Sequence, residues 1–175
     1  MDECRLVKPE LAMEAEILAY RAAMQAAGSS MDGTGTLRNG ISVAEWLEDN
    51  RRMENPETVP PNMVDAEQFV YVRKTDGRIV GMLQFRHRLN DYLASYGGHI
   101  GYSVRPEERK KGYAKRMLAD GLRHCKALGL THVLITCKVE NEGSRRTMLA
   151  NGGVYENTVH CSPENCDLQR YWFTL

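Results

Sequence analysis

The sequence lacks the features that mark membrane-spanning and secreted proteins. Its longest apolar runs fall far short of the about 20 residues that a membrane-spanning helix needs. Its first residues, Met-Asp-Glu-Cys-Arg, do not have the pattern of a signal peptide. The five cysteines are odd in number and have no framework spacing, which favours free thiols in a reducing compartment over disulfides. We therefore expect a cytoplasmic location.

An excess of charge of one sign is also missing. The 23 Lys and Arg residues balance 23 Asp and Glu residues, so the net charge is zero. A neutral molecule has no overall field that attracts nucleic acid or an anionic membrane, and we expect neither as a partner. The Walker loop, the dinucleotide-binding fingerprint and the Gly-x-Ser-x-Gly motif of serine hydrolases are absent as well.

The composition is that of an ordinary globular domain. Hydrophobic residues make up 42% of the 175 residues and charged residues 26%. We find no internal repeat, low-complexity segment or linker. Residues 1–175 are therefore expected to form a single domain with its own core.

The most informative stretch covers residues 97–151. A β-like segment at 99–104 precedes a helical pattern that ends at Leu128, and a second β-like segment covers 131–137. Pro106 keeps the residue before it extended, so the helix is expected to begin between residues 108 and 112. Apolar or small residues recur every three or four positions along one face of this helix, at Ala114, Met117, Leu118, Gly121, Leu122 and Cys125.

The start of this helix combines features that bind an anion. The first N–H groups of a helix have no acceptors within the helix, and its positive end favours negative charge. Gly112 allows close approach to the backbone because it has no Cβ. Basic side chains surround the helix start at Arg109, Lys110, Lys111, Lys115 and Arg116. The alternative is a basic helix start that faces solvent.

The rest of the chain alternates between helical and β patterns. A short strand at 4–7 precedes a helix from Pro9 to about residue 27, and Ser42 with Glu45 predicts a capping box on a second helix. Asp76-Gly77 predicts a hairpin between strands at 69–73 and 79–85, and a final strand pair covers 154–159 and 170–175. Residues 28–40 form either a mobile cover for a substrate site or a plain surface connection. This order predicts an α+β fold around one sheet, in which 131–137 runs parallel to the strand at Val104.

Arg109-x-x-Gly112-x-Ala114 resembles the Arg/Gln-x-x-Gly-x-Gly/Ala signature of the GCN5-related N-acetyltransferase (GNAT) superfamily. The setting of the motif is similar too, with Tyr102-Ser103-Val104-Arg105-Pro106 before it and Asn141-x-x-Ser144 after it. The resemblance covers about residues 69–175. Gly97-Gly98-His99-Ile100-Gly101-Tyr102, Ser144-Arg145-Arg146-Thr147, Asn151-Gly152-Gly153 and Arg170-Tyr171-Trp172 resemble a poorly characterised bacterial branch of predicted acetyltransferases.

The resemblance implies a GNAT-like fold and a cosubstrate. The fold would be a mixed, mostly antiparallel sheet of about seven strands with about four helices, splayed between strands 4 and 5. The chain would transfer an acetyl group from acetyl-coenzyme A directly to a primary amine in a ternary complex. By resemblance, Ser103 and Val104 lie near the thioester carbonyl. The other implied cofactor-binding residues are Arg109, Lys110, Lys111, Gly112, Tyr113, Ala114, Lys115, Asn141 and Ser144.

The general acid is where the sequence departs from the family pattern. Met148 stands where the family often has a tyrosine, and a thioether cannot donate a proton. Tyr102, Tyr113 and Tyr155 are the nearest substitutes in sequence, or the proton goes to water. The departure leaves open an alternative function, a non-catalytic domain that binds or senses acyl-coenzyme A.

The candidates for the general base and for the acceptor site each have an alternative interpretation without a catalytic or binding role. His99 has an unperturbed pKa of about 6.5, which suits a general base, but it also suits a hydrogen-bonded structural histidine. Arg86, His87 and Asn90 follow the preceding strand, where they line the acceptor site or simply face solvent.

No metal is expected. His160-Cys161-x-x-x-x-Cys166 supplies only three ligands at an unconventional spacing. The acceptor also stays open, because peptide N-termini, lysine side chains, polyamines, aminoglycosides and amino acids all suit one fold. A homodimer formed through the C-terminal strands is an expectation for this fold class, which light scattering would test.

Overall fold

The computed structural model describes residues 2–175. The strands in this part of the chain are β1 (Cys4–Val7), β2 (Ala66–Arg73), β3 (Ile79–Arg86), β4 (Ile100–Val104), β5 (His132–Lys138), β6 (Val154–Cys161) and β7 (Cys166–Thr174). The α-helices are α1 (Glu14–Ala26), α2 (Val43–Glu54), α3 (Tyr113–Ala127) and α4 (Glu142–Leu149). This composition confirms the predicted α+β class.

The strands separate at the predicted place, between the fourth and the fifth. One sheet has the order β1-β2-β3-β4 and the other the order β5-β7-β6, and all their pairings are antiparallel. Residues 131–137, expected to run parallel to the strand at Val104, form β5, which has its ladder with β7 and not with β4.

The two sheets are joined by His99, just before β4. Its N–H donates to Leu134 O (2.7 Å), and its Nδ1 accepts from Leu134 N–H (2.9 Å). Beyond this point, within residues 2–175, the facing edges of β4 and β5 share no backbone hydrogen bonds. We call these two parted edges, Ile100–Val104 and His132–Lys138, the split.

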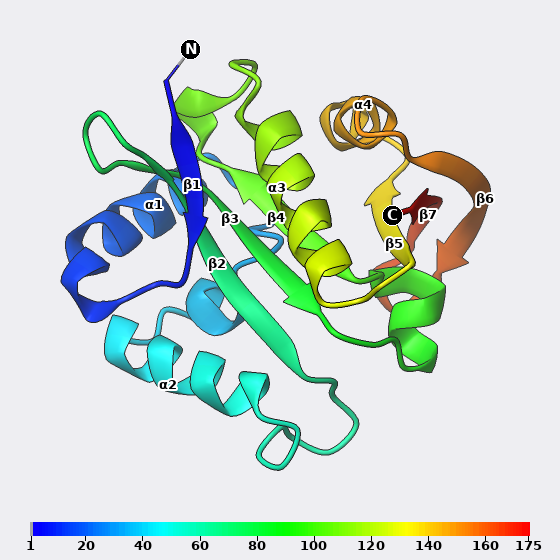
Figure 1. Cartoon of the computed structure of the whole chain (residues 1–175), viewed down its shortest axis with the longest axis horizontal. Coiled ribbons are helices and arrows are strands. Elements are labelled where there is room, and N and C mark those ends of the chain that lie inside the picture. Colours follow the sequence, from blue (N-terminus) through cyan, green and yellow to red (C-terminus); the bar gives the residue numbers. More distant parts are fainter. Residues whose placement is uncertain (1) are drawn as a thin grey trace.

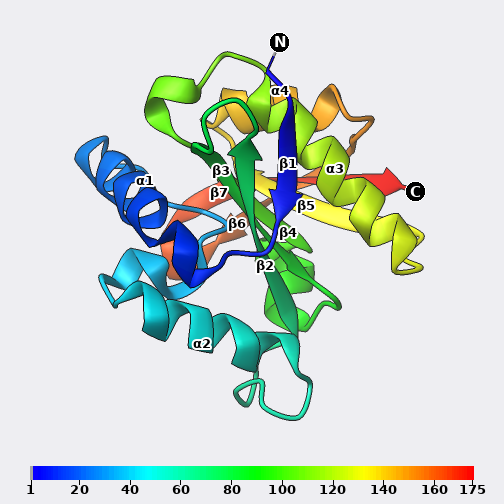
Figure 2. The same cartoon turned by 60° about the vertical axis from the view of Figure 1, so that its left-hand side comes forward.

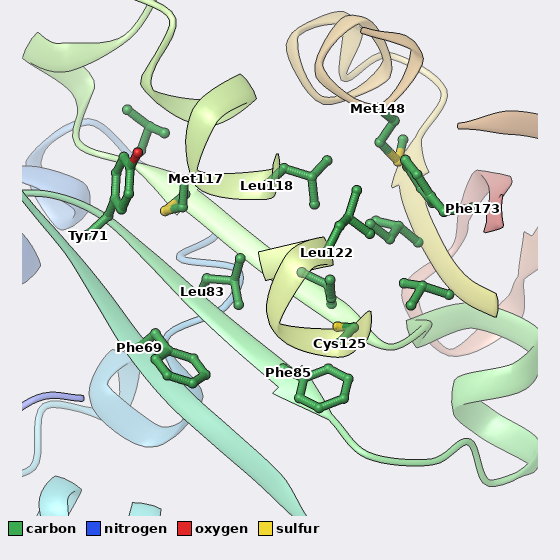
Figure 3. Close-up of a cluster of buried hydrophobic side chains, with 14 of the residues drawn as sticks. Phe69, Tyr71, Leu83, Phe85, Met117, Leu118, Leu122, Cys125, Met148 and Phe173 are labelled. Atoms are coloured by element: carbon green, nitrogen blue, oxygen red, sulfur yellow. The ribbon is translucent and has the colours of Figure 1, made fainter. Parts of the chain in front are cut away.

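The helices lie on both faces of the first sheet. α1 and α2 cover one face and α3 covers the other, while α4 lies beside α3 next to the second sheet (Figures 1 and 2). Side chains of β2 and β3 alternate between these layers. The α1–α2 side buries Ile17, Tyr20, Met24, Trp46, Val70, Val72 and Met82. The α3 side buries Phe69, Leu83, Phe85, Met117, Leu118 and Leu122 (Figure 3).

Helix α3 is the element that the sequence predicted best. The predicted apolar face is buried, with Met117 and Leu118 at 0% exposure. Gly121 allows close packing on β3, because a Cβ there would come within 2.8 Å of Leu83 Cδ1. The helix begins at Tyr113, just after the predicted window, with Gly112 as its N-cap residue.

Residues 28–40 form a packed segment that is fixed to the first sheet. Met31 and Leu37 are buried in the α1–α2 core. Trp46 Nε1 donates to Thr34 O (2.9 Å), and Gln68 Nε2 donates to Gly33 O (2.8 Å). These anchors fit neither the mobile cover nor the plain surface connection considered from the sequence.

Two further searches of residues 2–175 concern membranes and metals. No helix there is long and apolar enough to cross a bilayer. No group of three or more His, Cys, Asp or Glu side chains in that range could hold a metal ion. In the candidate segment at 160–166, His160 is bonded instead to Asp167, at 2.8 Å.

Candidate active site

The loop between β4 and α3 has backbone N–H groups without partners. Lys110 and Gly112 adopt left-handed conformations, with φ of 60° and 78°. Within the described chain, the N–H groups of residues 110–115 donate to no protein acceptor. Consecutive N–H groups in such a turn, at the positive end of a helix, form a concave site for an anion. The structure therefore provides the anion loop that the motif predicted.

The predicted basic side chains of this loop have different roles. Lys110 and Lys115 are exposed, so their charge is available beside the free N–H groups. Arg109 instead folds back, with Nε donating to Val104 O (3.0 Å) and Nη2 to Ser29 Oγ (3.3 Å). Arg109 thus anchors the loop to the end of β4 and to the segment after α1.

Glu108 holds the anion loop in place through ion pairs, a role that sequence reasoning did not predict. Its carboxylate is 3% exposed and accepts from Arg73 Nη1 (3.1 Å) and Lys111 Nζ (3.0 Å), with Arg78 Nε 3.3 Å away. Burial alone would raise the pKa of Glu108, but the bonds from Lys111 and Arg73 outweigh it and lower the pKa. The ionised carboxylate therefore ties the loop to the β2–β3 hairpin.

The free edge of β4 presents alternate backbone groups to the split. Arg86 N–H donates to His99 O (2.7 Å), which sets the phase of the β3–β4 ladder. Antiparallel ladder bonds involve every second residue, so the odd-numbered residues of 99–105 bond to β3. The N–H groups of Tyr102 and Val104 consequently face the split.

Ser103, predicted beside Val104 at the thioester carbonyl, points elsewhere. Its backbone pairs with Met82 in the ladder. Its hydroxyl lies 3.0 Å from Tyr20 Oη in the α1–α2 layer. Of the predicted pair, only Val104 directs its N–H toward the split.

Tyr102 reaches across the split to α4. Its Oη lies 2.8 Å from Ser144 Oγ, in the first turn of that helix. Asn141 Oδ1 caps the same turn by accepting Ser144 N–H (3.1 Å). Burial raises the pKa of Tyr102 well above its usual value, so its hydroxyl keeps its proton at neutral pH. The structure thus brings the predicted residues Tyr102, Asn141 and Ser144 together.

The chain matches the family model described as "Acetyltransferase (GNAT) family" over residues 40–152, more than half of its length. The chain belongs to the GNAT acetyltransferase family. This membership confirms the family to which the motif at residues 109–114 was likened, and no functionally curated protein matches the GNAT chain in sequence.

Solved structures agree on the GNAT fold. *Mycobacterium smegmatis* RimJ in complex with CoA-disulfide is 23% identical, with a TM-score of 0.73, and the match covers 98% of this chain and 81% of RimJ. The microcin C7 self-immunity acetyltransferase MccE in complex with acetyl-CoA and AMP is 16% identical, with a TM-score of 0.71 and coverage of 100% and 94%. A GNAT-family acetyltransferase from *Bacillus anthracis* is 19% identical, with a TM-score of 0.67 and coverage of 99% and 96%. At these identities the likeness establishes the fold alone.

Met148 lies in the core of this GNAT chain. It is 0% exposed and belongs to the same buried cluster as Phe173 on β7, beside which it lies in Figure 3. Three tyrosines were predicted as possible general acids in place of Met148. Of these, Tyr113 accepts a hydrogen bond from Arg73 Nη1 (3.1 Å) next to the anion loop. Tyr155 is 50% exposed on β6, with its hydroxyl 2.9 Å from Thr158 Oγ1. Tyr102 is thus the one of the three that reaches from β4 to α4.

His99 has the geometry of a structural residue and not that of the predicted base. Its Nδ1 lone pair is already engaged by Leu134 N–H (2.9 Å), and the residue is 7% exposed. Burial lowers the pKa of His99, which keeps the ring neutral. Protonating Nδ1 would break a bond between the two sheets.

The three predicted acceptor residues do not lie together. Arg86 faces the segment 28–40, because a Cβ on Gly101 would lie 3.5 Å from Arg86 Nη2 and 3.1 Å from Gly33 N. His87 points to the opposite face, 3.3 Å from Glu67. Asn90 bonds to Asn62 O (3.0 Å) and Leu93 N–H (2.9 Å), which stabilises the turn before β4.

Sequence reasoning missed Asp32 and Gly33. Gly33 has a φ of 75° and packs directly on β4, where a Cβ would come within 2.3 Å of Gly101 O. Asp32 therefore lies next to the strand that forms the split, although it is about 70 positions away in sequence. The only signal was the glycine-rich composition of residues 28–40, which does not reveal what the loop contacts.

Proposed function

We propose that this chain transfers an acetyl group from acetyl-coenzyme A directly to a primary amine. The observation that carries the proposal is the row of unpaired N–H groups at residues 110–115, which leads to the free edge of β4. The RimJ and MccE structures, which contain CoA-disulfide and acetyl-CoA, support the same cosubstrate. Family membership supports acetyl transfer in general.

The pyrophosphate would bind to the N–H groups of residues 110–115, with exposed Lys110 and Lys115 adding positive charge. The pantetheine arm would follow the split, where Val104 N–H can bond to the thioester carbonyl. Asn141 and Ser144 border this path at the start of α4.

In the transfer step, the free amine attacks the thioester carbon, a C–N bond forms and the C–S bond breaks. The amine loses a proton to water, and the departing thiolate takes one. We assign the donation of this proton to Tyr102, because its hydroxyl lies at the split beside Ser144 Oγ (2.8 Å). Val104 N–H would stabilise the oxyanion that develops before the C–S bond breaks.

Calorimetric titration with acetyl-CoA, coenzyme A and ATP tests the cofactor assignment. Gly112→Asp places a carboxylate and a Cβ at the anion loop, and it should weaken binding of both coenzyme forms by at least about 100-fold. Gly40→Asp is the matched control, because Gly40 also has a left-handed φ (79°) but no atom within 4 Å of its Cβ position. Unchanged affinity in Gly112→Asp would remove the anion-loop assignment.

Met148 is buried and supplies no proton, which favours one alternative function, a domain that binds or senses acyl-coenzyme A without catalysis. Such a domain would bind acetyl-CoA and hydrolyse it slowly, but it would acetylate no amine. Mass spectrometry of a mixed amine pool after incubation with acetyl-CoA separates the two functions.

A further inference from the structure

Three charged side chains surround β4 on the face opposite α3. We call Asp32, Arg38 and Arg86, together with the Gly101 backbone, the Arg86 cluster. Gly101 connects them, since its Cβ position lies 3.5 Å from Arg86 Nη2 and 3.1 Å from Gly33 N, the neighbour of Asp32. The next residue, Tyr102, turns its N–H to the split. The cluster therefore borders the place where the acceptor must meet the thioester.

Arg86 carries a charge that no carboxylate neutralises. Its Nη1 donates to the carbonyl oxygens of Gly97 (3.1 Å) and Gly98 (3.2 Å), and its Nη2 reaches Gln84 Oε1 only at 3.4 Å. Across residues 2–175, no Asp or Glu oxygen lies within 4.0 Å of its guanidinium. Burial lowers the pKa of Arg86, which is the expected effect of removing a cation from water without a partner.

Arg38 adds positive charge nearby, since the Cβ position of Gly35, to which it bonds, lies 3.3 Å from Gln84 Nε2, and the Gln84 side chain also contacts Arg86. Its Nε donates to Gly35 O (3.2 Å), and its charge opposes that of Arg86. Two neighbouring cations would repel an acceptor that carries a second ammonium group in addition to its reacting amine, such as a polyamine. They favour an acceptor that has an anionic group near its amine.

Asp32 is the carboxylate of the cluster and precedes Gly33, whose Cβ position lies 2.7 Å from Tyr102 Cα. It is exposed, and its Oδ2 accepts from Ser30 Oγ (2.7 Å). After burial, its negative charge is among the effects that raise the pKa of Tyr102, and it also raises that of Arg86. Asp32 forms no ion pair with Arg86 within 4.0 Å in the described chain, so both charges are available to an acceptor.

We propose that the acceptor is a zwitterionic primary amine of the amino-acid class, with Arg86 binding its carboxylate and Asp32 its ammonium group. This inference rests on the proposed acetyl transfer. Arg86 and Asp32 orient the acceptor so that its nitrogen, once deprotonated, faces the split. A planar guanidinium binds a carboxylate through two parallel hydrogen bonds, which gives direction as well as affinity.

The first experiment uses matched acceptors with the full chain and saturating acetyl-CoA. Free amino acids are compared with their primary amides and with the corresponding decarboxylated amines, and released thiol is measured. The amino acids should have a kcat/KM at least about tenfold higher than either analogue. The amide also represents a peptide N-terminus, so equal or faster use of amides or diamines would overturn the proposal.

Variants test which residues carry the preference. Arg86→Gln should raise KM for the amino acid at least about tenfold and change KM for its amide less than about twofold. Asp32→Asn should raise KM for both. The Kd of acetyl-CoA should not change in either variant, and Arg51→Gln, an exposed change on α2, should behave as wild type.

Arg86 also holds the carbonyls of Gly97 and Gly98, so a second variant is needed in case Arg86→Gln does not fold. Arg38→Gln then decides, because Arg38 is exposed; it should reduce the preference for amino acid over amide at least about threefold. An unchanged preference there overturns the proposal. The proposed function itself would be refuted if the wild-type chain bound no acetyl-CoA, or if it released thiol but acetylated none of the amines.

Discussion

Gly33 connects the acceptor side of the site to β4, and Gly33→Ala should destabilise the chain strongly. The added Cβ would lie 2.3 Å from Gly101 O, 2.6 Å from Gly101 C and 2.7 Å from Tyr102 Cα. Backbone atoms held in the β3–β4 ladder cannot move aside as a flexible side chain can. The segment 28–40 must therefore shift away from β4 or strain it.

The magnitude follows from two effects. A left-handed φ of 75° costs about 1–2 kcal/mol for alanine, and overpacking against a fixed neighbour adds about 1–3 kcal/mol. The free energy of unfolding should fall by about 2–5 kcal/mol. At this chain length, that corresponds to a Tm lower by about 5–15 °C.

Gly40→Ala separates these two effects. Gly40 has nearly the same φ, 79°, but no atom lies within 4 Å of its Cβ position. The free energy of unfolding of this variant should fall only by the conformational cost, about 1–2 kcal/mol, which lowers Tm by about 2–5 °C. Scanning calorimetry measures both, and similar Tm losses for the two variants would refute the packing argument.

Function gives a second readout for Gly33→Ala. A displaced segment carries Asp32 away from Gly101, so kcat/KM for the acceptor should fall. The Kd of acetyl-CoA should stay within about twofold, because in the described chain residues 110–115 share no hydrogen bond or ion pair with Gly33 or Asp32. Weaker binding of acetyl-CoA in this variant would show that the two sides are coupled.

Three further predictions concern the supports of the site. Glu108→Gln should lower the free energy of unfolding by about 1–3 kcal/mol in urea titrations, because it removes the buried charged acceptor that Arg73 and Lys111 share, whereas the half-exposed Glu107→Gln should change it by under about 0.5 kcal/mol. The pKa of Glu108 is lowered in the fold, so this contribution should be present above about pH 4.5 and be lost as the pH falls further. Tyr102→Phe should reduce kcat about 100-fold with little change in the Kd of acetyl-CoA, while the exposed Tyr155→Phe should match wild type in the same steady-state assay. The pKa of His99 is lowered in the fold, so wild-type stability should fall as the pH drops below about 6.5, and His99→Asn should show a shallower fall in thermal melts at pH 5.5–7.5.

Features set by a few neighbouring residues were predictable from the sequence. The Ser42–Glu45 capping box forms as expected, with Ser42 N–H bonded to Glu45 Oε2 (2.9 Å). Asp76-Gly77 turns the chain between β2 and β3. The anion loop belongs to this class, because its free N–H groups follow from Gly112 and from the start of α3.

Features set by distant residues were not predictable. Tyr102 meets Ser144 across 42 positions, and Arg73 meets Glu108 across 35. Hydrophobic periodicity indicates which face of an element is buried, but it does not indicate which polar groups come into contact there. The ladder partner of residues 131–137, which is β7, was not predictable for the same reason, since a β-branched run does not reveal its partner strand.

This difference between local and distant contacts also divides the site into two halves. The proposed pyrophosphate site is made of backbone groups from one continuous segment, so it requires little from side chains beyond Gly112. The proposed acceptor half depends on Asp32 and Arg86, which come from separate elements and are brought near each other because Gly33 packs on β4. Substitutions at such side chains can change the acceptor without disturbing the loop at residues 110–115. The identity of the acceptor must therefore be sought in the Arg86 cluster and not in the motif that identifies the family.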